Sequence, residues 1–157
     1  MKYDFLIEKL ELNAKRTHKT VTSFPDSKWL NSPGNDLKTA KELFTHILVA
    51  RWTHFQFIKD LNVDREKFGV HIRRLAPKTP HDLIAEEQKM SEEMISYFSG
   101  LSESDWEAVF LGYGGHPETR LSFLTGIIEH EYHHRAQLLV YYRLFGETPP
   151  NIYAALS

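Results

Sequence analysis

The sequence predicts an all-α protein that folds as a four-helix bundle. Four segments repeat apolar residues at intervals of three and four, as one face of a helix does, and no segment reads convincingly as a strand. The segments between them contain proline, glycine and asparagine, which favour turns. Four long helices bury their apolar faces most simply against one another, as a bundle. We expect the tail after the last helix to add one short C-terminal turn or helix.

Length and composition predict that residues 1–157 form one domain. The formal net charge of −2 gives no electrostatic reason to expect nucleic acid or an anionic membrane as a partner. The absence of cysteine excludes disulfides and thiolate ligands. No apolar run approaches the ~18 residues of a membrane span, and acidic residues interrupt the stretch where a signal peptide would be apolar. We therefore expect a cytoplasmic protein.

The first helix is predicted over about residues 3–20. Its apolar positions are Phe5, Leu6, Leu10, Leu12 and Ala14. A loop follows over residues 23–37, because two prolines and the pair Asn35-Asp36 favour turns there. Within this loop, Trp29 and Leu30 are expected to fold back onto the core.

The second helix is predicted over about residues 38–61. Thr39 followed by Glu42 fits a capping box, with Asp36 as a rival start. One stripe of this helix carries Leu43, Ile47, Ala50, His54, Phe57 and Leu61. Asn62 and the charged run after it are expected to end the helix.

The third helix is predicted over residues 80–99. Thr79 is a good N-cap, Pro80 suits the first helical position, and Gly100 is a plausible C-cap. Residues 101–119 hold three glycines and a proline, and part of this stretch is predicted to be a mobile connection.

The fourth helix is predicted over about residues 120–145 and carries the stretch IIEHEYHHRAQLL. His130 and His134 are four residues apart, so they lie on one face of the helix, together with its apolar residues. On the second helix, His46 shares a face with apolar neighbours in the same way. We therefore expect all three imidazoles to point toward the bundle interior.

Three inward histidines on two helices predict a metal site. Burying a neutral imidazole without a partner costs on the order of 1–3 kcal/mol. A divalent cation removes that cost, and histidines four apart on a helix can both reach one ion at about 2.1 Å. No fourth protein ligand is evident, so positions on the ion stay open to water or substrate, as in catalytic sites. Three imidazoles suit zinc, nickel, copper or iron alike, and no catalytic residue is identified.

Other interpretations of these residues stay open. A single inward histidine is more often a hydrogen-bonded core residue, and the histidines could instead pair with carboxylates without any metal. Glu131 could accept a hydrogen bond from an imidazole, and Gln137 could orient bound water or bond a neighbouring helix. His133 is expected at the edge of the apolar stripe or exposed, and Arg135 is expected to be structural.

The remaining aromatic residues and histidines are expected in the core or at the surface. Trp29, Trp52 and Trp106 are expected to be core or dimer contacts, and Phe57 and Tyr141 to form pocket wall. The histidines expected to be exposed are His18, His71, His81 and His116.

The tracts ELFTHILVARWTHF and HEYHHRAQLLVYYRLFGETPP resemble the DinB-like family of bacterial metal-binding four-helix bundles, which is unrelated to the DNA polymerase of that name. The tract SKWLNSPGNDLKTAKELFTHI is similar to the Trp-containing loop before that family's second helix. The resemblance implies a divalent ion, nickel or zinc, held by His46, His130 and His134, and frequent homodimers. It also implies a small-molecule partner, because some relatives are transferases that use low-molecular-weight thiols.

Two classes of function fit these observations. In the first, the chain is a metal-dependent enzyme, such as a thiol S-transferase or a hydrolase. A transferase would need a cationic or polar patch near the ion for the thiol's carboxylates, with Arg51, Lys59 or Arg120 as candidates. In the alternative, the chain is a non-catalytic, stress-related metal-binding protein in which the ion organises the bundle.

Overall fold

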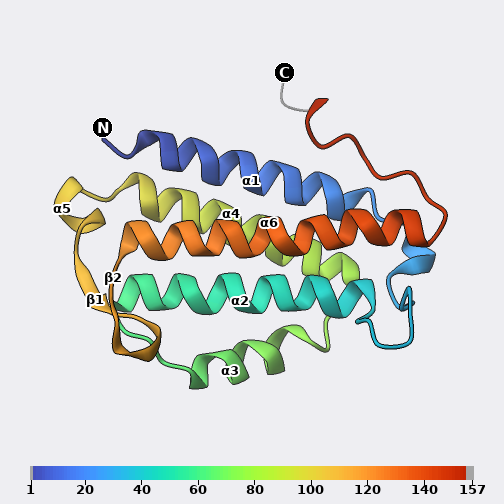
Figure 1. Cartoon of the computed structure of the whole chain (residues 1–157), viewed down its shortest axis with the longest axis horizontal. Helices are drawn as coiled ribbons and strands as arrows, with labels where there is room; N and C mark the ends of the chain where they lie inside the picture. Colours follow the sequence, from blue (N-terminus) through green and yellow to red (C-terminus); the bar gives the residue numbers. More distant parts are fainter. Residues whose placement is uncertain (1, 155–157) are drawn as a thin grey trace.

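The computed structural model describes residues 2–154, which form a bundle of four long helices (Figure 1). These helices are α1 (Asp4–Thr22), α2 (Ala40–Asp60), α4 (Pro80–Ser99) and α6 (Arg120–Leu144). The predicted fold class is confirmed, and each predicted helix boundary lies within two residues of the observed one. The small differences arise because capping residues, rather than the apolar pattern, determine where a helix begins and ends.

Capping boxes begin three of the long helices. Thr39 caps α2: its hydroxyl accepts from the Glu42 amide, and the Glu42 carboxylate accepts from the Thr39 amide. The helix therefore begins at the predicted threonine and not at its rival Asp36. Thr79 caps α4 through Asp82 in the same way, with Pro80 at the first helical position.

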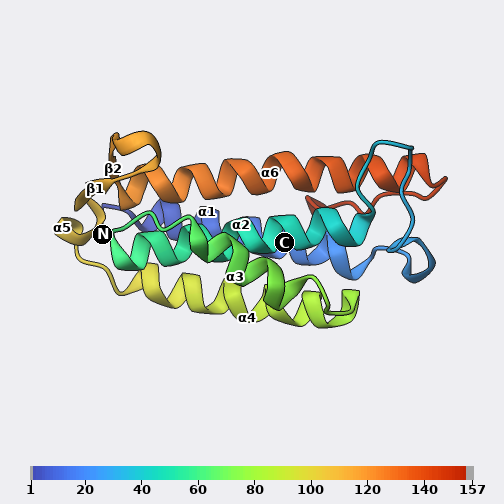
Figure 2. The same ribbon diagram turned by 90° about the horizontal axis from the view of Figure 1, so that it is seen from below.

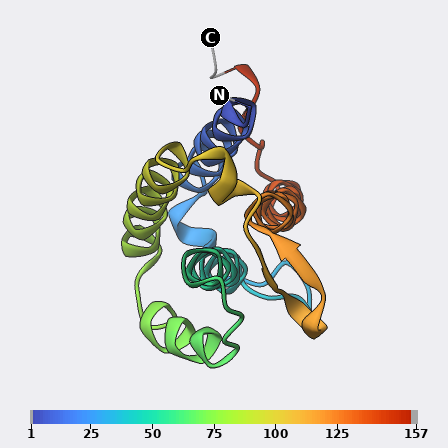
Figure 3. The ribbon, with the colours of Figure 1, turned by 90° about the vertical axis from the view of Figure 1, so that its left-hand side faces the viewer.

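Viewed end-on, the four helices lie in the order α1, α4, α2, α6 around the bundle (Figure 3). The neighbours α2 and α4 run in the same direction, so the chain has to return along the bundle between them (Figure 1). A shorter helix, α3 (Glu66–Leu75), makes this return along the outer side of α2. No helix was predicted here, although Phe68, Ile72 and Leu75 repeat at helical spacing, because the segment has only 10 residues and follows a charged run.

Residues 101–119 are more ordered than the sequence predicted. They form a short helix α5 (Glu103–Trp106) and an antiparallel hairpin of β1 (Val109–Leu111) and β2 (Pro117–Thr119). The expectation that the chain contains no strand is therefore wrong. Each strand has only three residues, too few for a recognisable alternation. A 3-10 turn η2 (Tyr113–Gly115) joins the strands, and positive φ angles at Gly114 and Gly115 make this turn possible.

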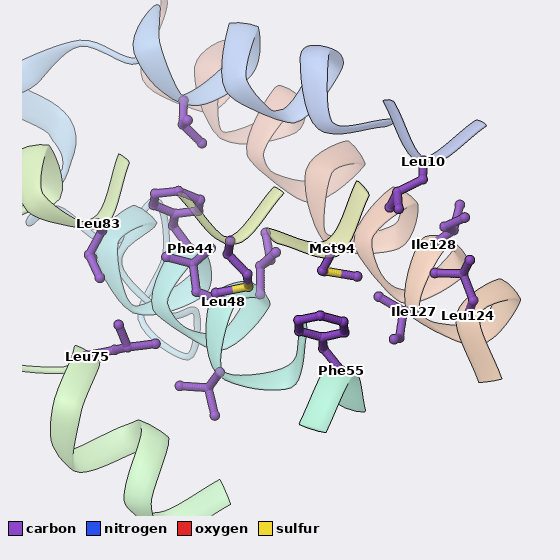
Figure 4. Packing of buried hydrophobic residues seen from close by; sticks show 14 of the residues in the cluster. Leu10, Phe44, Leu48, Phe55, Leu75, Leu83, Met94, Leu124, Ile127 and Ile128 are labelled. Atoms are coloured by element: carbon purple, nitrogen blue, oxygen red, sulfur yellow. The ribbon is translucent and has the colours of Figure 1, made fainter. Parts of the chain in front are cut away.

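The hydrophobic core lies between the long helices (Figure 4). Phe44 and Phe55 of α2 and Met94 of α4 are fully buried in it. Trp29 follows the 3-10 turn η1 (Asp26–Lys28) and packs against Phe24 and Phe44, as predicted. Its neighbour Leu30 is 70% exposed, so that half of the prediction is wrong. Trp106 is also buried, whereas Trp52 is only partly buried and packs against the core's edge.

The tail after α6 was predicted to add one turn. Asn151 begins a turn there, because its side-chain oxygen accepts hydrogen bonds from the amides of Tyr153 and Ala154. The last three residues, 155–157, lie outside the described residues. None of the described helices is long and apolar enough to cross a membrane.

Candidate metal centre

Three histidine side chains converge between α2 and α6. The Nε2 atom of His130 lies 3.2 Å from that of His46 and 3.1 Å from that of His134. One nitrogen from each ring lies within 4.8 Å of one from each of the others. Helical spacing brings His130 and His134 together on α6, but only the packing of α2 against α6 brings His46 to them. The predicted convergence is observed; metal binding by these residues stays a prediction.

The site lies on the outer side of the α2–α6 pair and not in the bundle interior, as had been expected. His46 is exposed, and His130 and His134 are half-buried. The expectation was wrong because a residue at the edge of an apolar stripe lies in the groove between two helices, whereas the middle of the stripe faces the core. On α6, buried Leu124 and Leu138 occupy that middle. The site is therefore open to solvent on one side.

The spacing of the nitrogen atoms suits a shared cation. Two ligands that are each about 2.1 Å from one ion lie about 3.0 Å apart at a right angle and about 3.4 Å apart at a tetrahedral angle. The observed 3.1 and 3.2 Å fall between these values. Hydrogen bonding alone cannot satisfy the group, because His130 Nε2 faces two other ring nitrogens and can donate at most one proton. A cation would accept all three lone pairs.

Electrostatics keep these imidazoles neutral, as metal ligands must be. Partial burial and the neighbouring histidines lower the pKa of His130 to about 4. Partial burial, together with His134 and Lys38, lowers the pKa of His46. Partial burial also lowers the pKa of His134, although its hydrogen bond with Gln137 opposes the shift.

Gln137 fixes the orientation of the His134 ring. Its side-chain oxygen lies 2.7 Å from His134 Nδ1, which makes Nδ1 the protonated nitrogen and leaves Nε2 with a free lone pair. Its amide nitrogen lies 3.3 Å from Nε2 of His133, which is exposed as expected. The sequence suggested a water or a neighbouring helix as the partner of Gln137; the observed partners are instead histidines one turn away on α6.

Glu131 does not bond an imidazole, contrary to one expectation. It is 2% exposed and forms an ion pair with Arg51 of α2, whose Nε lies 2.9 Å from Glu131 Oε2. Arg51 also donates to Glu87 of α4 at 3.1 Å, and Thr17 of α1 donates to Glu131. Burial opposes ionisation of Arg51, but the two carboxylates raise its pKa overall. These four residues tie the long helices together inside the bundle.

Arg135 has the structural role that was expected. It is 6% exposed, and its guanidinium donates to the backbone and side-chain oxygens of Asn13 and to the Thr17 hydroxyl. Its side chain therefore joins α6 to α1, on the side of α6 away from the histidine group.

A cavity of about 460 Å³ adjoins His46, between α2 and α3. Lys38, Lys41 and the carboxylate of Glu42 lie on its wall, and Val49, Phe68 and Ile72 supply an apolar surface. Two lysines against one carboxylate make the charged part of the wall cationic overall. Because α3 was not predicted, the sequence could not indicate this cavity.

The three cations suggested from the sequence do not line this cavity. Arg51 is enclosed in the buried ion pairs. Arg120 donates to the backbone carbonyls of Ile58 and Asp105. Lys59 pairs with Glu93 on the bundle surface.

His54, which was predicted on the apolar stripe of the second helix, lies in the same groove, on one side of His130. Its Nε2 atom is 2.7 Å from the Tyr113 hydroxyl, and its ring centroid is 6.4 Å from that of His130. Burial and His46 lower the pKa of His54 to about 4. Burial raises the pKa of Tyr113 to about 12, although Arg65 opposes this. No spacing in the sequence indicated Tyr113, because the hairpin alone carries it to the groove.

The other histidines lie apart from this group. His81 and His116 are exposed, as expected. His18 and His71 are partly buried, contrary to expectation, and His18 Nδ1 lies 3.0 Å from Glu87 Oε2. Of the residues expected to form pocket wall, Tyr141 lines a groove on α6 with Gln137, whereas Phe57 is fully buried in the core.

Comparison with known proteins agrees with this fold. The sequence model of the DinB family matches residues 2–157. No curated protein matches the chain. Among solved structures, a DinB-like protein from Bacillus subtilis, YjoA, is 22% identical with a TM-score of 0.73, and the match covers 93% of this chain and 95% of that one.

Two further structures share the fold at lower identity. YfiT from Bacillus subtilis, described as a probable metal-dependent hydrolase with an unusual four-helix bundle topology, is 17% identical with a TM-score of 0.73 over 92% of this chain and 88% of its own. A mycothiol-dependent maleylpyruvate isomerase is 11% identical with a TM-score of 0.64 over 97% of this chain and 66% of its own. At these identities the matches show the fold alone.

Proposed function

This chain belongs to the DinB family, and we propose that it is a divalent-metal-dependent enzyme that transfers a low-molecular-weight thiol to an electrophilic small molecule. His46, His130 and His134 would hold the ion, which we propose to be nickel or zinc. The observation that carries this proposal is the convergence of three neutral imidazoles beside a cavity with two lysines. We further propose a homodimer, which the mass of the protein in solution would test.

The residues around the group suit an ion with open positions. When bound, a divalent ion acts as a Lewis acid and lowers the pKa of a thiol or water that reaches it. Among the described residues, only the three histidines form a group that could hold an ion. Exposed His46 leaves one side of the group accessible, and Gln137 holds the His134 ring in place. An incompletely liganded ion at an open groove suits catalysis better than a structural role.

The cavity next to His46 would bind the thiol substrate. Lys38 and Lys41 would attract the carboxylates of the thiol, while its carbon chain lies along Val49 and Phe68. Lys41 is held near the cavity by a hydrogen bond of 3.0 Å to the backbone oxygen of Ala76. In the transfer, the sulfur forms a bond to the electrophilic carbon, the leaving group departs with its electron pair, and the thiol proton passes to solvent.

Thiol conjugation tests this proposal. The rate at which mercaptosuccinate, a thiol dicarboxylate, displaces chloride from 1-chloro-2,4-dinitrobenzene would be measured with metal-loaded and with EDTA-treated protein. We expect the rate above background to require the metal and to fall at least about 100-fold in His130→Ala. Equal rates with and without EDTA would reject the proposal.

The lysines would be tested with a second thiol. The double variant Lys38→Ala/Lys41→Ala is expected to lose most of its rate with mercaptosuccinate but little with the uncharged mercaptoethanol. Lys59→Ala is the matched control, because Lys59, like Lys41, is on α2 but pairs with Glu93. If both thiols lost rate equally, the assignment of the cavity to carboxylates would be wrong.

Hydrolysis is the second candidate reaction. The open side of the site admits water as readily as a thiol, and a relative with the same fold is described as a probable metal-dependent hydrolase. Release of p-nitrophenol from p-nitrophenyl acetate, dependent on the metal and independent of added thiol, would favour this reaction over transfer.

The non-catalytic alternative has less support. An ion that organised the bundle would have to join helices that otherwise pack poorly, but Arg51, Glu87 and Glu131 already join α2, α4 and α6 inside the core. We therefore expect EDTA to lower the melting temperature without loss of helical circular dichroism. Unfolding of the EDTA-treated protein at room temperature, without any turnover when metal is present, would support the alternative instead.

A further inference from the structure

A second cavity adjoins the histidine group, on the opposite side from the lysines. It measures about 290 Å³ and lies between His54 of α2, Tyr113 of the hairpin and the first half of α6. Phe123 and Ile127 form apolar wall, and His130 forms part of its boundary. The two cavities thus reach different members of the group, His46 and His130. Figure 2 shows the hairpin at the start of α6 and α3 alongside α2.

The polar part of this second cavity is the pair of Tyr113 and His54. Their side chains are hydrogen-bonded at 2.7 Å, and the Tyr113 ring is stacked on that of Phe123 with centroids 5.8 Å apart. A hydroxyl group both donates and accepts. The hydrogen bond with His54 uses either the donor or the acceptor of the Tyr113 hydroxyl, so the other remains available to a ligand. The bond to His54 and the stacking on Phe123 fix the position of the Tyr113 side chain.

Gly126 keeps the cavity open. Glycine inside a helix is destabilising relative to alanine, so its presence in the middle of α6 calls for a reason. Packing gives none: a Cβ atom at Gly126 would meet no atom within 4 Å, and the backbone there is ordinary helix. What the missing side chain does provide is space, because Gly126 lines the cavity one turn before His130.

The charges favour an uncharged ligand. Among the described residues, no lysine or arginine lines this cavity, and its one carboxylate, Glu118, would repel an anion. The guanidinium of Arg65 lies over the Tyr113 ring, 5.6 Å from its centroid, but Arg65 is not a lining residue. A cation in the neighbouring histidine group would repel a second cation. From these observations we infer that this cavity binds the uncharged, aromatic or apolar co-substrate, with its polar group on the Tyr113 hydroxyl. Binding of such a ligand is inferred from the cavity itself. Its role as the electrophile that reacts with the thiol rests on the proposed function.

Binding of benzamide, an uncharged aromatic amide, tests the inference without turnover. Benzamide would be titrated into metal-free and metal-loaded protein while the ring signals of Tyr113 and His54 are followed by NMR. We expect both signals to shift, and the dissociation constant to rise at least about tenfold in Gly126→Leu, which fills the cavity, and about fivefold in Tyr113→Phe. Benzoate is expected to bind more weakly than benzamide to the metal-free protein.

Thr125→Leu is the matched control, because Thr125 is an exposed neighbour on α6 that does not line the cavity. Circular dichroism would establish that each variant is folded. Benzamide binding that is absent, that Gly126→Leu leaves unchanged, or that Thr125→Leu weakens equally would overturn the inference. Elemental analysis of the same samples reports separately on the metal, so loss of the proposed function and loss of this cavity ligand are distinguishable.

Discussion

The Nε2 atoms of His46 and His130 lie 3.2 Å apart, although 84 positions separate these residues in the chain. A single N–H···N hydrogen bond could join these two neutral rings, but His130 Nε2 cannot form a second such bond to a third ring nitrogen. With His134 Nε2 a further 3.1 Å from that of His130, the arrangement brings three lone pairs to one place. A divalent cation is the simplest partner for them.

Removal of any one ligand should abolish tight metal binding. We expect His46→Ala, His130→Ala and His134→Ala each to weaken binding of zinc or nickel by more than about 100-fold, because loss of a ligand should exceed the effect of losing a residue that merely supports one. Elemental analysis of protein purified without a metal-affinity column measures this. His81→Ala, at an exposed position in the first turn of α4, is the control and should keep full metal content.

Gln137 should tune the affinity through His134. Gln137→Leu removes the acceptor 2.7 Å from His134 Nδ1, so the ring loses its fixed tautomer and orientation. We expect metal affinity to fall by about 10- to 100-fold, as for other residues that orient a ligand. A chelator competition titration measures the change. Gln137→Glu retains an acceptor and should retain most of the affinity; equal loss in both variants would refute an orienting role.

The buried ion pairs should dominate the stability of the bundle. Arg51→Met leaves the carboxylates of Glu87 and Glu131 buried without their cation, and we expect the free energy of unfolding to fall by about 3–5 kcal/mol. Urea denaturation followed by circular dichroism measures it. Lys59→Met, on the same helix, breaks the surface pair with Glu93 and a contact of the ammonium group with the Phe55 ring, and should change stability by less than about 1 kcal/mol. Similar losses in the two variants would contradict the argument.

The contact between His18 and Glu87 should make stability depend on pH. The hydrogen bond to Glu87 raises the pKa of His18, with partial burial opposing the shift. A group whose pKa is raised by folding stabilises the protein fully below its unfolded pKa of about 6.5, and this contribution disappears as pH rises past the folded value.

The comparison of wild type with His18→Gln isolates this effect. We expect the wild type to be more stable than the variant at about pH 6 and the difference to shrink by about pH 9. Denaturation midpoints at the two pH values measure it. A difference that grows with pH would show that the His18 contact has the opposite sign.

The long helices were predictable because their signals are local. The capping boxes at Thr39 and Thr79 and the spacing of apolar residues lie within single segments of the chain. The helix α3 and the β1–β2 hairpin were missed, because each is short and is stabilised mainly by the surface on which it packs. The hairpin carries Tyr113, and α3 forms one wall of the lysine-lined cavity, so both of these features were missed with the elements that form them.

The sequence by itself determined the fold class, the approximate helix ends and the pair His130 and His134, because 3.6-residue periodicity places these two histidines on one face of α6. The packing of α2 against α6 then brings His46 to them. Only the tertiary structure decided that this group lies in a solvent-open groove, that Glu131 pairs with Arg51 and not with an imidazole, and that two dissimilar cavities flank the site. Periodicity gives the direction of a side chain relative to its own helix axis. Burial and partners depend on where neighbouring helices stand, which is fixed by packing between segments distant in the chain.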